Sequence, residues 1–250
     1  MIENKDVSLF VVSHKKVKHI LKEPGYKYIS VGGHYRDDYN DNDGKDNISE
    51  KNPYYCELTA TYWIWKNCDS NYVGLLHYRR LFGKRILGLF FKPAKIGKLK
   101  ELATVNDAVL SKPYPFKKKT AKQHYIEARG SEELDATEEV IKVRFPKYLP
   151  YWNEVMNSHS IHACNIIFCK KEVFDRYCEF LFPLLNEVEK KLGNIDRVYG
   201  YISEWLLDVF VKGENLQYKE YNVVFMQTIP QRIRSKFKNL SIRVNKLLKR

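Results

Sequence analysis

Short apolar runs alternate with longer amphipathic segments along most of the chain. The runs are rich in β-branched and aromatic side chains, which is the pattern of strands buried on both faces of a sheet. They cover residues 7–12, 28–31, 72–76, 107–110, 163–169 and 221–226. Apolar side chains recur at helical spacing within residues 55–67, 120–139, 152–156, 172–191 and 201–211. This alternation predicts an α/β protein with a mainly parallel sheet flanked by helices.

Two stretches interrupt the alternation. Residues 36–49 are polar and acidic, and we expect a loop over a cleft there. Residues 83–100 are basic, apolar and irregular in pattern, and include Phe90 and Phe91 among Lys and Arg neighbours. Two interpretations of this second stretch stay open: a surface that touches lipid headgroups or an acceptor, or a disordered flap.

The C-terminal residues 232–250 have a composition of their own. They contain eight Lys or Arg and no acid, and their apolar side chains recur at helical spacing. This predicts a basic amphipathic helix lying on an anionic membrane surface. A helix folded back on the protein and a nucleic-acid-binding tail are the alternatives. We therefore divide the chain into a domain at 1–230 and a tail at 231–250.

Composition narrows the class of protein further. Of 250 residues, 44% are apolar, which is typical of a globular protein, and the net charge is +13. Because eight cations belong to the tail, the remaining charge does not indicate a nucleic-acid groove. Five cysteines with no CxxC pair indicate reduced thiols and no structural zinc. No long apolar run and no secretory signal are present, so we expect a cytoplasmic protein.

Cationic side chains follow two of the predicted strands. Strand 72–76 ends in His77, Tyr78, Arg79 and Arg80, and strand 7–12 is followed by His14 and Lys15. Ligands of open α/β sheets bind outside the carboxyl ends of the strands. A guanidinium group presents a rigid fork of donors that suits phosphate or carboxylate oxygens. We therefore expect an anionic ligand at this edge; an arginine pair that only caps the strand or pairs with nearby acids is the alternative.

Several motifs together resemble a known family. They are VVSHKK at 11–16, DNIS at 46–49, KNP at 51–53, ELT at 57–59, YWIWKN at 62–67, YVGL at 72–75, HYRR at 77–80, CNIIF at 164–168, Arg197, and GYISE at 200–204. In this order they resemble a bacterial family from capsule and exopolysaccharide gene clusters, long described only as a domain of unknown function. Its members look like nucleotide-sugar-dependent glycosyltransferases, some of which transfer galactofuranose. The resemblance covers about residues 7–226.

The resemblance implies a GT-A-like fold and a donor site at the HYRR motif. Many GT-A enzymes hold a divalent metal on the donor diphosphate with an Asp-x-Asp motif, which is missing after this strand. We expect cations of the protein to neutralise the diphosphate instead. The donor-binding residues would be His14, Lys15, His77, Tyr78, Arg79 and Arg80. No metal is then required, although Asp37, Asp38, Asp41 and Asp43 are alternative ligands for Mn or Mg.

The resemblance also implies an acceptor site. Glu204 matches the acid that opens an acceptor-side helix in GT-A enzymes, and as a catalytic base it would need a raised pKa. Its alternative role is a helix-start acid favoured by the helix dipole. The other substrate-binding candidates are Asn47, Ser49, Asn52, Glu57, Asn165, Arg197 and Gly200. Asn165 has an alternative too, as a side chain that hydrogen-bonds the backbone at a strand end.

Together these expectations describe a peripheral enzyme at the inner face of the cell membrane. It would transfer a hexose, galactofuranose or another, from a UDP-linked donor to a lipid-linked oligosaccharide during capsule or exopolysaccharide synthesis. The alternative function is a non-catalytic binding or scaffolding protein of the same machinery.

Overall fold

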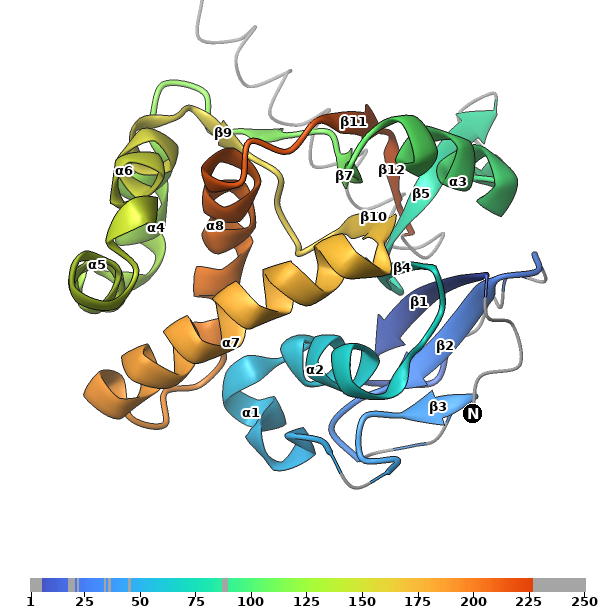
Figure 1. The fold of residues 1–250 in the computed structure, drawn as a ribbon, viewed down its shortest axis with the longest axis horizontal. Helices are drawn as coiled ribbons and strands as arrows, with labels where there is room; N and C mark the ends of the chain where they lie inside the picture. Colours follow the sequence, from blue (N-terminus) through green and yellow to red (C-terminus); the bar gives the residue numbers. More distant parts are fainter. Residues whose placement is uncertain are drawn as a thin grey trace, which may run out of the picture.

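A central sheet with helices on both faces forms the body of the molecule (Figure 1). The structure, a computed structural model, describes residues 6–226 apart from 18–20, 22, 34, 36, 45 and 87–89. The strands are β1 (Val7–Ser13), β2 (Tyr26–Ser30), β3 (Tyr39–Asn40), β4 (Tyr72–His77), β5 (Arg80–Ile86), β6 (Phe90–Pro93), β7 (Ala108–Ser111), β8 (Tyr114–Pro115), β9 (Ser160–Ile161), β10 (Ile167–Lys170), β11 (Tyr218–Tyr221) and β12 (Val223–Phe225).

Helices fill most of the connections between these strands. They are α1 (Asn52–Tyr55), α2 (Leu58–Asn67), α3 (Ile96–Val105), α4 (Ala121–Arg129), α5 (Glu132–Arg144), α6 (Leu149–Asn157), α7 (Lys171–Leu192) and α8 (Val198–Gly213), with short 3₁₀ turns at Ser49–Lys51 and Pro146–Tyr148. None of the helices within the described residues is long and apolar enough to cross a membrane.

The strand order along the main path of the sheet is β11-β7-β10-β4-β1-β2-β3. Neighbours are parallel except where β10 runs antiparallel to both β4 and β7, so the described strands of this path share one direction apart from β10. The predicted α/β class and mostly parallel sheet are thus confirmed. Strand β5 turns back from β4 and pairs antiparallel with β6 and β12, which extends the sheet as a branch.

Alternate side chains of the strands feed two separate apolar cores. Phe10 and Val12 of β1 pack with α2, α7 and α8, whereas Leu9 and Val11 pack on the opposite face with α3. Figure 1 shows α2 and α7 crossing one face of the sheet, with α4, α5 and α6 grouped beyond α8. Since both faces are covered, the strands need apolar side chains on both sides, which explains the continuous apolar runs.

Of the two interpretations of residues 83–100, the disordered flap is wrong for the described residues 83–86 and 90–100. This stretch contains the end of β5, then β6 and the first half of α3. Strand β5 pairs with β12, where Phe82 lies opposite Val223, a partner far along the chain. The strand buries Leu81 and Phe82 but exposes Lys84. Its apolar part is therefore too short for the local sequence pattern to predict a strand.

Several predicted elements are interrupted in the structure. The expected helix at 55–67 is divided at Cys56, and the helix expected at 120–139 is divided at Gly130 into α4 and α5. The last strand expected at 221–226 is the shorter β12, with the unpredicted β11 just before it, and the strand expected from Ala163 begins only at Ile167. The basic helix expected at 232–250, and with it the proposed domain boundary, lies outside the described residues.

Candidate functional site

The HYRR motif forms a tight hairpin at the carboxyl end of β4. His77 pairs with Arg80, which leaves Tyr78 and Arg79 in the turn. The Tyr78 N–H donates to the Val12 carbonyl at 2.9 Å, and the Met226 N–H donates to the Arg79 carbonyl at 2.7 Å. The hairpin backbone is therefore held by β1 on one side and by the end of β12 on the other.

Arg79 and Arg80 have no acidic partner in direct contact. Arg79 is exposed and Arg80 half-buried, and no carboxylate of the described residues lies within ion-pair distance of either guanidinium. The alternative in which these arginines pair with nearby acids therefore finds no support in this part of the chain. Two guanidinium groups without a bound acid remain available to an anionic ligand.

A cavity of about 300 Å³ lies beside the hairpin, at the carboxyl edge of β1 and β4. Six of the predicted site residues line it, from four separate parts of the chain: His14, Asn52, Glu57, His77, Arg79 and Arg197. Since β1 and β4 are parallel neighbours, their carboxyl ends meet at this edge. The structure thus brings these six residues together as the motif order alone could not.

His77 is a neutral hydrogen-bonding group at this cavity. Burial, together with the charges of Arg79 and Arg80, lowers its pKa to about 3. Its Nδ1 accepts a hydrogen bond from the Arg79 N–H at 3.3 Å, so the remaining proton of the neutral ring is on Nε2. His77 can therefore donate one hydrogen bond to a ligand, but it contributes no positive charge near neutral pH.

Tyr78 supports the cationic side chains around it. Its ring lies 4.6 Å from the His77 ring and 5.5 Å from the His14 ring, measured between centroids. Lys15 Nζ and Arg79 Cζ each lie 5.4 Å from its centroid, within the range of cation–π attraction. Cationic side chains from the end of β1 and from the hairpin thus lie around the Tyr78 ring.

The break between α1 and α2 brings Glu57 to the cavity. Cys56 has φ 52 and ψ −128, which ends α1 and redirects the chain into α2. Its carbonyl accepts a hydrogen bond from Asn52 Nδ2 at 2.8 Å, and Thr59 Oγ1 donates to the buried Asp41 carboxylate at 2.6 Å. These bonds hold the break in place, and Glu57 follows it at the start of α2.

Gly200 makes this break possible by its small size. A Cβ atom at this position would lie 3.0 Å from the Cys56 Cβ and 3.2 Å from its Sγ. Helix α8 therefore approaches the broken helix more closely than any larger residue would allow. The structure explains Gly200 by packing, and its predicted contact with substrate stays a prediction.

Asn165 connects Glu57 to α8. Its Nδ2 donates to Glu57 Oε1 at 3.0 Å and to Ser203 Oγ at 2.9 Å, while its Oδ1 is buried without a partner among the described residues. The backbone N–H of Cys164 donates to the Glu204 carboxylate. The segment that precedes β10 thus holds two acidic side chains close to each other, one from α2 and one from α8.

Both carboxylates are shifted toward protonation. Burial, followed by the charge of Glu57, raises the pKa of Glu204 to about 7, against the opposing charges of Arg80 and Arg197. Burial also raises the pKa of Glu57, although the Asn165 hydrogen bond and the charge of Arg197 oppose the shift. A carboxylate with a pKa near 7 is suited to exchange protons at neutral pH.

The segment before β10 has an uncommon backbone conformation. Cys164 has φ 74 and Asn165 has φ 51, two consecutive non-glycine residues in the left-handed region. Such conformations cost about 1–3 kcal/mol each and occur where surrounding contacts enforce them, often at functional sites. Here they direct the Cys164 N–H toward one glutamate and the Asn165 amide toward the other.

The family model DUF4422, a domain of unknown function, matches residues 8–215. The chain belongs to this family. A search of curated proteins by sequence finds no match.

A solved structure has a similar fold. It is described as "WbbM bifunctional glycosytransferase apo structure", with a TM-score of 0.76 and 24% sequence identity. The match covers 89% of this chain and 46% of that chain, so this DUF4422 chain spans about half the length of the structure it matches. At this identity the likeness shows that the two share a fold.

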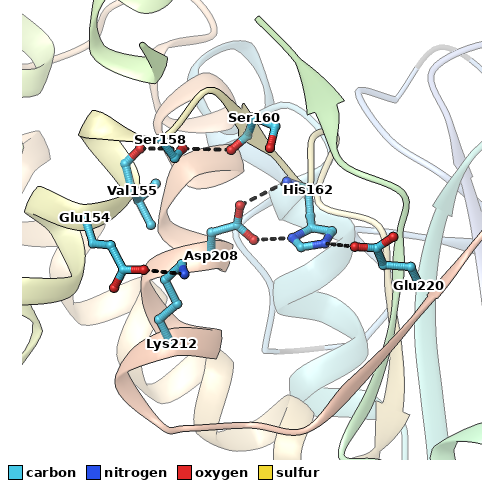
Figure 2. A network of polar contacts seen from close by, with 8 residues as sticks. All are labelled: Glu154, Val155, Ser158, Ser160, His162, Asp208, Lys212 and Glu220. Carbon is cyan, nitrogen blue, oxygen red and sulfur yellow. Dashed lines mark hydrogen bonds and ion pairs between the residues drawn. The ribbon is translucent and has the colours of Figure 1, made fainter.

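A further polar cluster in this DUF4422 chain escaped the sequence analysis (Figure 2). The His162 Nδ1 lies 2.6 Å from Asp208 Oδ1, the His162 N–H donates to Asp208 Oδ2 at 3.0 Å, and Nε2 lies 3.7 Å from Glu220. Burial lowers the His162 pKa, but the Asp208 hydrogen bond and the Asp208 and Glu220 charges outweigh it, so the net shift is upward.

The double contact with Asp208 fixes His162 to α8. His162 precedes Cys164 by two residues, and Asp208 follows Glu204 by one helical turn, so both pairs lie along the same side of α8. The cluster therefore positions the segment that holds the two glutamates. The one-turn spacing of Asp208 from Glu204 within α8 could have indicated Asp208 from the sequence. No residue near His162 in the sequence indicated that Asp208 is its partner.

Some predicted residues lie away from the cavity. Asn47 Oδ1 accepts hydrogen bonds from the Ser49 N–H at 3.2 Å and the Ser49 hydroxyl at 2.9 Å, and neither residue lines the cavity. This is a local turn before the 3₁₀ turn at Ser49–Lys51. The structure gives these two residues a backbone role, and their contact with substrate stays a prediction.

The four aspartates proposed as alternative metal ligands serve separate local purposes. Asp38 accepts from the Tyr28 N–H at 3.2 Å, Asp43 from the Asn40 N–H at 2.8 Å, and Asp37 from the Tyr35 hydroxyl at 3.0 Å. Asp41 accepts from Thr59. Within the described ranges, no three His, Cys, Asp or Glu side chains converge as a protein-held metal site requires. These aspartates therefore do not fit a shared metal ion.

Proposed function

We propose that this DUF4422 chain is a glycosyltransferase that uses a nucleotide-sugar donor. One observation carries the proposal: guanidinium groups with no bound acid among the described residues and a pair of carboxylates with raised pKa meet at one edge of the sheet. An anionic leaving group and a hydroxyl nucleophile need these two kinds of group side by side. The fold shared with a bifunctional glycosyltransferase supports the same reaction class.

The donor diphosphate would lie against the HYRR hairpin. Arg79 and Arg197 line the cavity, Arg80 follows at the start of β5, and His14 and Lys15 lie around the Tyr78 ring. We propose that these groups neutralise the diphosphate, and that His77 donates a hydrogen bond from Nε2. Protein cations would thereby stabilise the departing nucleotide, so the reaction would require no metal ion.

Glu204 would be the catalytic base of an inverting transfer. Its carboxylate would remove the proton of an acceptor hydroxyl while that oxygen forms a bond to the anomeric carbon of the donor sugar. The bond between this carbon and the diphosphate would break, and its electron pair would remain on the diphosphate. Glu57 would raise the proton affinity of Glu204 through its negative charge, and Asn165 would hold Glu57 in place.

The substrates follow from the family resemblance and from the basic C-terminus. We propose a UDP-linked hexose, galactofuranose or another, as donor and a lipid-linked oligosaccharide of capsule or exopolysaccharide synthesis as acceptor. Residues 232–250 would hold the enzyme at the inner face of the cell membrane, where such an acceptor is found. Asn52 would contact substrate from the wall of the cavity.

Titration calorimetry with UDP tests the donor site. We expect the double variant Arg79→Ala/Arg80→Ala to lose at least about tenfold in UDP affinity, because each charge-assisted contact contributes about 1.5–3 kcal/mol. Wild-type binding should persist in a buffer with EDTA. Arg144→Ala, on the exposed end of α5, is the control and should bind UDP normally. Unchanged affinity in the double variant would refute the diphosphate site, whereas binding without sugar transfer would favour the scaffolding alternative.

A further inference from the structure

A large basic groove lies apart from the cavity of the candidate site. It has a volume of about 1280 Å³ and is lined by the β5–β6 hairpin, the start of α3, Lys112 after β7, and β11 with the residues next to it. Figure 1 shows these elements gathered at one end of the sheet. Six lysines line the groove: Lys84, Lys92, Lys95, Lys98, Lys112 and Lys219.

Most of this charge is not neutralised by the residues that the structure describes. Lys98 pairs with Glu101 at 2.6 Å, but the other five lysines have no carboxylate within ion-pair distance among the described residues. The acid that lines the groove, Glu220, lies 3.7 Å from His162. Five exposed ammonium groups around one hollow repel one another, and a bound anion would relieve that repulsion.

Large apolar side chains are exposed on the same elements. Ile86 on β5 is 42% exposed, Tyr218 on β11 is 41%, Phe225 on β12 is 41% and Val105 at the end of α3 is 76%. Cations interspersed with exposed apolar groups are typical of surfaces that lie in the headgroup region of an anionic bilayer. A site for a free phosphate would instead need a fixed, buried arrangement of donors.

We infer that this lysine groove docks the protein onto anionic phospholipid headgroups. Lysine is a compact charge on a flexible stem, which suits a fluid array of headgroups better than one fixed ligand. In the proposed function, this groove would be the surface of the folded domain that faces the membrane. Its docking role rests on the proposed function only for the nature of the acceptor.

Strand β5 connects the groove to the candidate site. It begins at Arg80, in the HYRR hairpin, and ends at the exposed Ile86. Seven residues of strand span roughly 20 Å. A protein docked through the groove would hold the cavity beside the HYRR hairpin within that distance of the headgroups. This is close enough for the saccharide of a lipid-linked acceptor to reach the cavity.

Vesicle co-sedimentation with the full chain tests the inference. The groove variant replaces Lys84, Lys92, Lys95, Lys112 and Lys219 with Gln, and the control variant replaces Lys66, Lys117, Lys118, Lys190 and Lys191, which are exposed lysines outside the groove. Both variants lose the same charge and keep the basic tail. On vesicles of phosphatidylcholine with phosphatidylglycerol, we expect the groove variant to bind at least about tenfold more weakly than the control.

Further measurements decide between the possible outcomes. Wild-type protein should not bind vesicles of phosphatidylcholine alone, and inorganic phosphate should compete no better than chloride at equal ionic strength. Equal vesicle binding by the groove and control variants would overturn the inference, as would tighter binding of wild type to soluble RNA or an acidic polysaccharide. UDP titration of the groove variant should match wild type, so that loss of docking is distinguished from loss of the donor site; circular dichroism checks its fold.

Discussion

At the scale of single residues, environment determines what each titratable group of the candidate site can do. His77 lies among cations and is neutral, whereas Glu204 lies beside another acid and has a pKa of about 7. The same residue types on an open surface would be partly charged and fully ionised, respectively, at neutral pH. The hydrogen-bond donor and the base of the proposed reaction are thus products of burial and neighbouring charge.

Glu204→Gln should lower kcat by at least about 100-fold, because the amide cannot accept the acceptor proton. UDP affinity should stay at the wild-type value. In the proposed mechanism only the deprotonated form of Glu204 acts as the base, so the wild-type rate should rise as pH increases through about 7 and level off above it. Steady-state kinetics against pH, with UDP titrations in parallel, measure both effects.

Glu154→Gln is the matched control for this variant. Glu154 is an exposed acid that pairs with Lys212 at 2.7 Å, outside the cavity, and its loss should leave kcat unchanged. A wild-type rate that is constant between pH 6 and pH 8 would contradict the assignment of Glu204 as base.

At the scale of elements, the candidate site depends on interruptions of regular structure. Helices α1 and α2 are separated at Cys56, which has a positive φ angle. Cys164 and Asn165 take a left-handed backbone conformation before β10. The double contact of His162 with Asp208 holds the second of these irregular segments against α8. The helices and strands form the scaffold of the site, and the residues with irregular backbone conformation orient its acidic side chains.

Gly200→Ala tests the contact that holds the first interruption. The added Cβ would lie 3.0 Å from the Cys56 Cβ, so Cys56 and the neighbouring Glu57 must move by a few tenths of an ångström. We expect about 1–3 kcal/mol lower stability from overpacking, partly offset by alanine's better helix propensity, and a lower kcat. Chemical denaturation and steady-state kinetics measure these effects.

Gly97→Ala supplies the baseline for that comparison. Gly97 lies in the first turn of α3, and a Cβ there would meet no atom within 4 Å. This variant should keep its activity and gain up to about 0.5 kcal/mol in stability. If both alanine variants behaved alike, Gly200 would not control the position of Glu57.

At the scale of the whole molecule, positive charge is concentrated in two regions besides the donor site. One is the lysine groove, and the other is the tail at 232–250, with eight cations. A single weak attachment gives only marginal membrane binding, and stable binding takes two. We therefore expect the groove and the tail to act together at the membrane.

Removal of residues 232–250 should release the protein from phosphatidylglycerol-containing vesicles at moderate salt, because up to eight cations leave the surface. UDP affinity and thermal stability should not change, since the family match ends at residue 215 and the last described strand, β12, ends at Phe225. Vesicle co-sedimentation across a range of salt concentrations measures the effect. Full retention of binding by the shortened chain would mean that the tail takes no part in attachment.

The sequence by itself determined the local features of this protein. The apolar runs of β1, β4 and β7 and the periodic stripes of α7 and α8 located those elements, because each pattern depends on near neighbours. The cations after β1 and β4 predicted a shared edge, and six predicted residues do line one cavity there. Motif order also pointed to a family described as a domain of unknown function, and the match of residues 8–215 to DUF4422 confirms that part of the prediction.

The tertiary structure alone decided how distant residues meet. The bond from Asn165 to Glu57 joins residues 108 positions apart, and His162 meets Asp208 across 46 positions. Because β5 pairs with β12, a stretch with an irregular sequence pattern is part of the sheet, and the lysine groove lies beside it. Burial and the charges of remote neighbours shift a pKa only once the chain has folded, so no local pattern of residues contains them.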